Sequence, residues 1–162
     1  MNSQKKILTR HSLRKILQRL RRRGKTIAFT NGCFDILHLG HVSYLEAAKK
    51  QNRILIVALN SDRSTREIKG RNRPIIPQKE RAAVLAALKC VDYVTIFDET
   101  TPLKVIETLK PDVLVKGADW KGKDVVGLRL VKSYGGGVEF IRYVKGISTT
   151  QIIQKIIEKC PK

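Results

Sequence analysis

Acidic residues are scarce in this chain: 14 Asp and Glu stand against 33 Lys and Arg, giving a formal net charge of +19 over 162 residues. The chain also lacks an apolar run of about 18 residues and an N-terminal signal-peptide pattern, which argues against a membrane span and against secretion. Its three cysteines, Cys33, Cys90 and Cys160, show no metal or redox spacing and suit a reducing cytoplasm. Without repeats or low-complexity segments, the chain is expected to form one cytoplasmic domain.

The positive charge is concentrated at the N-terminus. Residues 1–25 contain ten Lys and Arg and no Asp or Glu. Between Leu13 and Leu20 the apolar residues follow the spacing of one helix face, and Ser12 and Gly24 supply a cap and a stop. This predicts a basic amphipathic helix whose apolar stripe packs on the domain. Because a basic chain attracts nucleic acid or anionic membranes, a nucleic-acid-binding protein is an alternative function of a different class.

Short apolar strands alternate with helices over the remaining sequence. The predicted strands cover residues 26–30, 53–59, 93–97, 113–115 and 138–141. The predicted helices cover residues 40–51 and 79–88, with others beginning near Thr101 and Ser148. Residues 61–77 are predicted to form one long polar loop. Such alternation predicts an α/β fold, a Rossmann-like parallel sheet with helices on both faces, whose ligands bind at the carboxyl ends of the strands.

Two histidines mark the predicted start of the helix that follows the first strand. His38 and His41 stand three residues apart, which places them on one side of a helix, and Gly40 leaves room for a ligand between them. The first amides of a helix have no intrahelical partner and bind phosphate. The pattern therefore favours a polyphosphate site that stabilises charge during nucleotidyl transfer. Because His11 is the only other histidine in the sequence, a zinc site is not predicted.

The motif around these histidines resembles a known family. Residues 32–41, GCFDILHLGH, are similar to the G-x-F-D-x-x-H-x-G-H signature of cytidylyltransferase-like nucleotidyltransferases, and the resemblance extends over about residues 26–157. Four further stretches resemble the adenylyltransferase half of the bifunctional heptose kinase/adenylyltransferase, namely residues 59–62, 69–75, 115–120 and 146–153. The resemblance implies a fold of the nucleotidyltransferase type, with the basic segment 1–25 followed by a single nucleotidyltransferase domain, 26–162, and no kinase half.

Site residues follow from the same resemblance. It implies catalytic roles for His38, His41 and Lys69. The implied nucleotide-binding residues are Thr30, Asn31, Gly32, Phe34, His38, Gly40, His41, Lys116, Gly117, Asp119, Ser148, Thr149 and Thr150. On the acceptor side the implied residues are Asp35, Arg73 and Tyr143.

Several of these residues also have structural explanations. Ser148 and Gln151 match a capping box, which alone explains them as a helix start. The segment GADWKGKD at residues 117–124 fits a P-loop spacing but ends in Asp where a hydroxyl is needed for magnesium, so it is not a P-loop. Trp120 either stacks on a base or covers the core. A charged loop carrying Lys69 is either solvated or a lid over the phosphates.

The implied reaction joins ATP and a sugar 1-phosphate, D-glycero-β-D-manno-heptose 1-phosphate, to give ADP-heptose and pyrophosphate for the lipopolysaccharide inner core. Mg²⁺ is expected to be held mainly by the nucleotide phosphates. The alternative within the class is a glycerol-3-phosphate cytidylyltransferase, but that family has an arginine where this chain has Tyr143. Since similar enzymes often dimerise, a homodimer is implied. Nucleic acid is not the expected physiological partner, because no nucleic-acid-binding module is recognisable.

Overall fold

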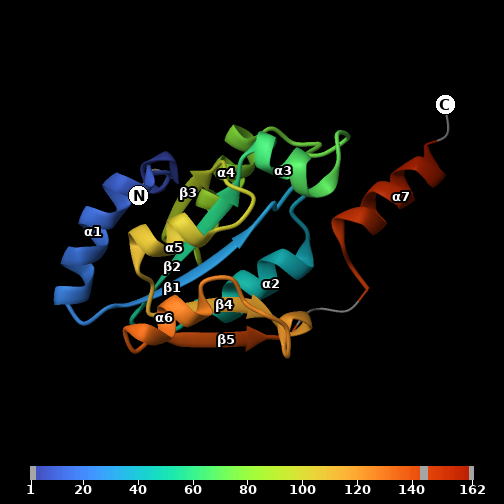
Figure 1. The fold of residues 1–162 in the computed structure, drawn as a ribbon. Coiled ribbons are helices and arrows are strands. Elements are labelled where there is room, and N and C mark those ends of the chain that lie inside the picture. Colours follow the sequence, from blue (N-terminus) through green and yellow to red (C-terminus); the bar gives the residue numbers. More distant parts are fainter. Residues whose placement is uncertain (1–2, 143–145, 161–162) are drawn as a thin grey trace.

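The computed structural model describes residues 3–142 and 146–160 of the chain. Five strands pair in parallel to form one sheet in the order β3-β2-β1-β4-β5 (Figure 1). The strands are β1 (Thr26–Gly32), β2 (Arg53–Asn60), β3 (Tyr93–Phe97), β4 (Val113–Gly117) and β5 (Gly137–Ile141). All five lie where the apolar runs predict them, and the Rossmann-like α/β fold is confirmed.

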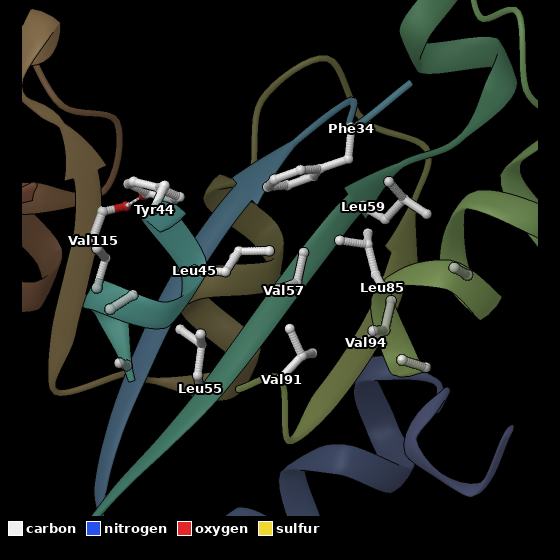
Figure 2. Packing of buried hydrophobic residues seen from close by; sticks show 14 of the residues in the cluster. Phe34, Tyr44, Leu45, Leu55, Val57, Leu59, Leu85, Val91, Val94 and Val115 are labelled. Carbon is white, nitrogen blue, oxygen red and sulfur yellow. Dashed lines mark hydrogen bonds between the residues drawn. The ribbon is translucent and has the colours of Figure 1, made fainter. Parts of the chain in front are cut away.

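Helices cover both faces of this sheet because side chains alternate along each buried strand. Ile27 and Phe29 face a layer made by α1 (Arg10–Arg22), α5 (Leu103–Leu109) and α6 (Leu128–Ser133). Ala28 faces the opposite layer, made by α2 (Leu39–Ala48) and α4 (Gln78–Ala87). Figure 2 shows this second layer, in which Phe34 from the histidine motif packs with the core residues.

The basic N-terminal helix packs on the domain as its apolar stripe predicts. Leu13 and Leu17 are fully buried. Ile7, which follows the short 3-10 helix η1 (Ser3–Lys6), forms a parallel β-bridge with Val94 of β3. The prediction of Ser12 as the cap is wrong. The cap lies three residues earlier, at Thr9, whose hydroxyl accepts the backbone N–H of Ser12 at 3.2 Å, so the helix begins at Arg10.

The predicted loop over residues 61–77 is wrong in its first half, where the chain forms α3 (Asp62–Lys69). The Ser61 hydroxyl caps this helix by accepting the N–H of Ser64 at 3.1 Å, and Gly70, at φ +95°, ends it. The helix escapes notice in the sequence because its buried side is made of Ser64 and Thr65, which carry no apolar signal. The short helix α6 is also absent from the sequence prediction.

Chain connections place the ligand edge of the sheet between β1 and β4. The strand order reverses there, since β2 follows β1 on one side and β4 adjoins it on the other. The 3-10 helix η2 (Ala118–Trp120) leaves β4 at this edge. The last helix, α7 (Thr149–Lys159), projects away from the sheet and buries none of its residues (Figure 1). No helix within residues 3–142 and 146–160 is long and apolar enough to cross a bilayer.

Candidate active site

A cavity of about 690 Å³ opens at the carboxyl ends of β1 and β4. Most of the residues singled out in the sequence line this cavity. They are Thr30, Asn31, Gly32, Phe34, Asp35, His38, His41, Lys69, Arg73, Lys116, Gly117, Ser148, Thr149 and Thr150. Gly40 and Asp119 do not line it, and Tyr143 lies outside the described residues. Segments more than 100 residues apart in the sequence therefore meet at one opening.

The two motif histidines stack on each other at the start of α2. Their ring centroids are 3.8 Å apart with planes at 18°, and Phe34 lies against His41 at 5.0 Å between centroids. Gly40 permits this arrangement, because a Cβ atom there would lie 3.1 Å from the His38 ring and 3.2 Å from the side chain of Ile147. Gly40 thus acts by letting His38 and the segment before α7 approach each other.

Burial disfavours the charged form of both imidazoles. It lowers the pKa of His38, and it lowers the pKa of His41 to about 4, with repulsion from His38 adding to the effect and the Ile36 carbonyl opposing it. Within the described part of the chain, the buried Nδ1 atoms of His38 and His41 have no hydrogen-bond partner. A neutral imidazole carries one N–H donor and one acceptor, so the pair offers hydrogen bonds to a ligand without bringing two positive charges together.

We expect the neutral state of His41 to make stability depend on pH. Unfolding restores the usual pKa of 6.5, so between that value and about 4 the unfolded chain binds a proton that the folded chain does not. The free energy of unfolding therefore keeps its full value above pH 6.5. It decreases as the pH falls toward 4, by up to about 3 kcal/mol at roughly 1.4 kcal/mol per pKa unit. Urea unfolding at a series of pH values should show this slope in the wild type and a smaller one in His41→Gln. Equal slopes in the two proteins would contradict it.

A second helix start faces the cavity from α7. The Ser148 hydroxyl accepts the backbone N–H of Gln151 at 3.2 Å and donates to the Gln151 side-chain oxygen at 3.1 Å, so Ser148 caps the helix as predicted. The Thr149 hydroxyl donates to the Ile36 carbonyl at 3.4 Å, which joins α7 to the histidine motif. Structural and binding roles are therefore compatible, because Ser148, Thr149 and Thr150 line the cavity and the cap bond uses one of the first amides of α7.

Asp35 anchors a neighbouring segment and has little capacity left for a ligand. Its side chain is almost fully buried and accepts the Arg73 Nε–H at 2.5 Å and the backbone N–H groups of Ile75 and Ile76 at 2.8 and 2.9 Å. Burial raises the pKa of Asp35, but these hydrogen bonds and the Arg73 charge outweigh it and hold the pKa below its usual range. The carboxylate thereby fixes Arg73 at the cavity wall.

Lys116 and Trp120 form the wall at the end of β4. The Lys116 ammonium donates to Asn31 Oδ1 at 2.6 Å and lies 5.2 Å from the centre of the Trp120 ring. Burial lowers the pKa of Lys116 to about 8, with Asp119 opposing the shift. Trp120 lines the cavity and is 36% exposed, so it does not cover the core and its ring is available for stacking. Lys69 lines the same cavity from the last turn of α3.

Sequence reasoning missed two residues that hold the site together. Arg81 on α4 is 2% exposed and donates to the Ile76 carbonyl and to Asp62 Oδ1, both at 2.8 Å, and to the Cys33 carbonyl. Tyr44 on α2 donates to the Val115 carbonyl at 2.8 Å, so it ties α2 to β4. No local pattern marks either residue, because an arginine in an amphipathic helix normally faces solvent and a tyrosine beside leucine and alanine normally fills a core.

Comparison with known proteins adds to this geometry. A family model described as cytidylyltransferase-like matches residues 29–155. "Bifunctional protein HldE" of Syntrophotalea carbinolica is 56% identical over 154 residues, 95% of this chain and 31% of that protein. The protein of the same name in Geobacter metallireducens is 55% identical over 156 residues, 96% of this chain and 32% of that protein. The chain thus spans about a third of the length of these curated relatives.

One solved structure has a similar fold and a related sequence. The crystal structure of the lipopolysaccharide core biosynthesis protein from Thermoplasma volcanium superposes with a TM-score of 0.60 at 32% identity. The match covers 75% of this chain and 98% of that one. The structural likeness therefore includes nearly the whole of that protein.

Proposed function

Since the chain belongs to the cytidylyltransferase-like family of nucleotidyltransferases, we propose that it transfers AMP from ATP to D-glycero-β-D-manno-heptose 1-phosphate. The products are ADP-heptose, a precursor of the lipopolysaccharide inner core, and pyrophosphate. The observation that carries this proposal is the meeting of the stacked histidines with the start of α7 at one cavity. The identity with HldE proteins and the likeness to a lipopolysaccharide core biosynthesis protein support the choice of acceptor.

The proposed reaction is one in-line displacement. An oxygen of the acceptor phosphate forms a bond to the α-phosphorus of ATP while the bond from that phosphorus to the pyrophosphate oxygen breaks. No protein nucleophile is needed, because the acceptor phosphate is already ionised near neutral pH, and catalysis consists of positioning and charge stabilisation. In this scheme His38 and His41 donate hydrogen bonds to phosphate oxygens whose charge grows in the transition state.

Residues at the cavity rim have separate roles in the proposal. The amides and hydroxyls at the start of α7, from Ser148 to Thr150, bind the β- and γ-phosphates. Lys69 neutralises the departing pyrophosphate. Arg73, whose Nε is held by Asp35, presents its remaining N–H groups to the acceptor phosphate.

The cavity does not supply a protein-built site for Mg²⁺. Asp35 is the one carboxylate among the described residues that line the cavity, and its oxygens already accept three N–H groups. Within residues 3–142 and 146–160, no three His, Cys, Asp or Glu side chains are grouped as metal ligands. The donor set therefore fits an ion that arrives on the nucleotide phosphates and not one held by carboxylates. No step of the proposed mechanism depends on a protein-bound metal.

Nucleotide choice tests this proposal against its alternative within the family. We expect kcat/KM for ATP to exceed that for CTP by about 10²-fold, because a pocket that hydrogen-bonds one base leaves buried polar groups unpaired with the other. The pocket wall in question contains Asn31, Lys116 and Trp120. Pyrophosphate release should be measured for each nucleotide with heptose 1-phosphate and with glycerol 3-phosphate. Should CTP with glycerol 3-phosphate prove the best pair, the protein is a glycerol-3-phosphate cytidylyltransferase. The homodimer implied by the resemblance stays a prediction.

A further inference from the structure

The outer side of α1 carries a group of exposed cations, here named the α1 cationic face. Its members are Arg14, Lys15, Arg19, Arg22 and Arg23. Among residues 3–142 and 146–160, none of these five side chains has a hydrogen bond or an ion pair. Nothing in the described part of the domain therefore balances their charge.

Other arginines of the same helix turn inward. The Arg10 guanidinium pairs with Glu99, with 2.8 Å between Nη1 and Oε1, and Arg21 donates to the Leu109 carbonyl at 2.8 Å. Together with the buried Leu13 and Leu17, these contacts fix α1 to the domain. The α1 cationic face is thus a separate set of charges on the exposed side of a helix that is fixed to the domain.

Repulsion between like charges on this face is not offset by any acidic residue of α1. Arg14 and Lys15 lie beyond the first turn of α1, so the helix dipole neither favours nor disfavours them, and α1 contains no acidic residue that could pair with them. Lys15, Arg19 and Arg23 follow at four-residue spacing, so like charges adjoin along one side. The dipole accounts for cations in the last turn but not for this whole row. A polyanionic partner would remove the repulsion.

We propose that the α1 cationic face docks the protein on an anionic phospholipid bilayer. The apolar side of α1 is buried in the domain, so the helix lies on a surface and does not insert. Residues 3–25 contain no Phe, Tyr or Trp, which removes the stacking that binds single-stranded nucleic acid. The cations extend along a helix roughly 20 Å long, so several of them can contact the lipid phosphates of a flat membrane surface at once.

Docking through α1 leaves the catalytic cavity open. No described residue that lines the cavity belongs to α1, and Figure 1 shows α1 and α7 on opposite sides of the sheet. The inference therefore stands apart from the proposed reaction, and binding to a membrane can be measured independently of turnover.

The test uses the full chain and two matched triple variants. One variant, Lys15→Gln, Arg19→Gln and Arg23→Gln, removes three charges from the α1 cationic face while keeping good helix formers. The control variant, Lys79→Gln, Lys89→Gln and Lys159→Gln, removes three exposed charges from α4, from the residues that follow it and from α7, none of which is paired with another described residue. Co-sedimentation is measured with vesicles of equimolar phosphatidylglycerol and phosphatidylcholine, with vesicles of phosphatidylcholine alone, and with duplex DNA as competitor.

The wild type and the control variant should bind the anionic vesicles and not the neutral ones. The α1 variant should bind them about 10²-fold more weakly, from roughly fivefold per cation near a charged membrane, with turnover unchanged in vesicle-free buffer. Equal weakening in both variants would show that total charge and not this face binds the vesicles, and would overturn the inference. It is also overturned if the wild type does not bind anionic vesicles, or if duplex DNA displaces the protein and binds it more tightly through the same cations.

Discussion

Replacing His38 or His41 with alanine is expected to lower kcat about 10²–10³-fold while the protein stays folded. That range is typical for loss of one preorganised donor to a growing negative charge. The two rings stack at 3.8 Å, and burial disfavours their charged form, so each contributes a hydrogen bond and not a fixed charge. Pyrophosphate release under saturating substrate gives kcat, and circular dichroism reports on folding.

His11 supplies the matched control, because it is the remaining histidine and lies exposed on α1, away from the cavity. His11→Ala should leave kcat unchanged. A folded His41→Ala protein with turnover close to that of the wild type would remove His41 from the mechanism.

Replacing Arg81 with methionine is expected to lower the free energy of unfolding by about 3 kcal/mol and to lower kcat as well. The variant keeps the apolar volume but removes the Arg81 donor from the Ile76 and Cys33 carbonyls and the paired charge from Asp62, which keeps only the Gln78 N–H as a donor among the described residues. The estimate takes the low end of the range for a broken buried pair, because Asp62 is 29% exposed and water reaches it.

Arg66→Met is the control, since Arg66 is exposed and has no ion pair among the described residues. It should change the unfolding free energy by less than about 0.5 kcal/mol. Urea unfolding measures both variants, and kcat is compared at a temperature where both stay folded. A loss below about 1 kcal/mol for Arg81→Met would show that the Arg81 hydrogen bonds contribute little.

The parts of the site that a sequence can predict are those whose signals are local. β1, the motif turn and α2 follow each other directly, so an apolar run and two histidines at a helix start were enough to place them. The start of α7 was predictable for the same reason, from the capping pattern that begins at Ser148. The cavity itself also follows from topology, because parallel strands bring their carboxyl ends to one edge.

The contacts that complete the site depend on residues distant in sequence. Asp35 is expected on the acceptor side, which stays a prediction, and the structure adds that it holds Arg73, Ile75 and Ile76, about 40 residues away. Arg81 bridges the motif turn and α3 across up to 48 residues. Such pairings depend on how α4 packs, which no local spacing encodes. The exposed face of α7 is a further example, because its isoleucines follow the spacing of a buried stripe, yet Ile156 and Ile157 are 53% and 62% exposed.

The most direct test of the account follows the α-phosphorus of ATP into its product. The protein is incubated with heptose 1-phosphate, Mg²⁺ and ATP labelled at the α-phosphate, and the products are separated and identified. The account predicts that the label appears in ADP-heptose with one equivalent of pyrophosphate, and that no label attaches to the protein when the acceptor is left out. Label on the protein, or transfer only from CTP to glycerol 3-phosphate, would contradict it.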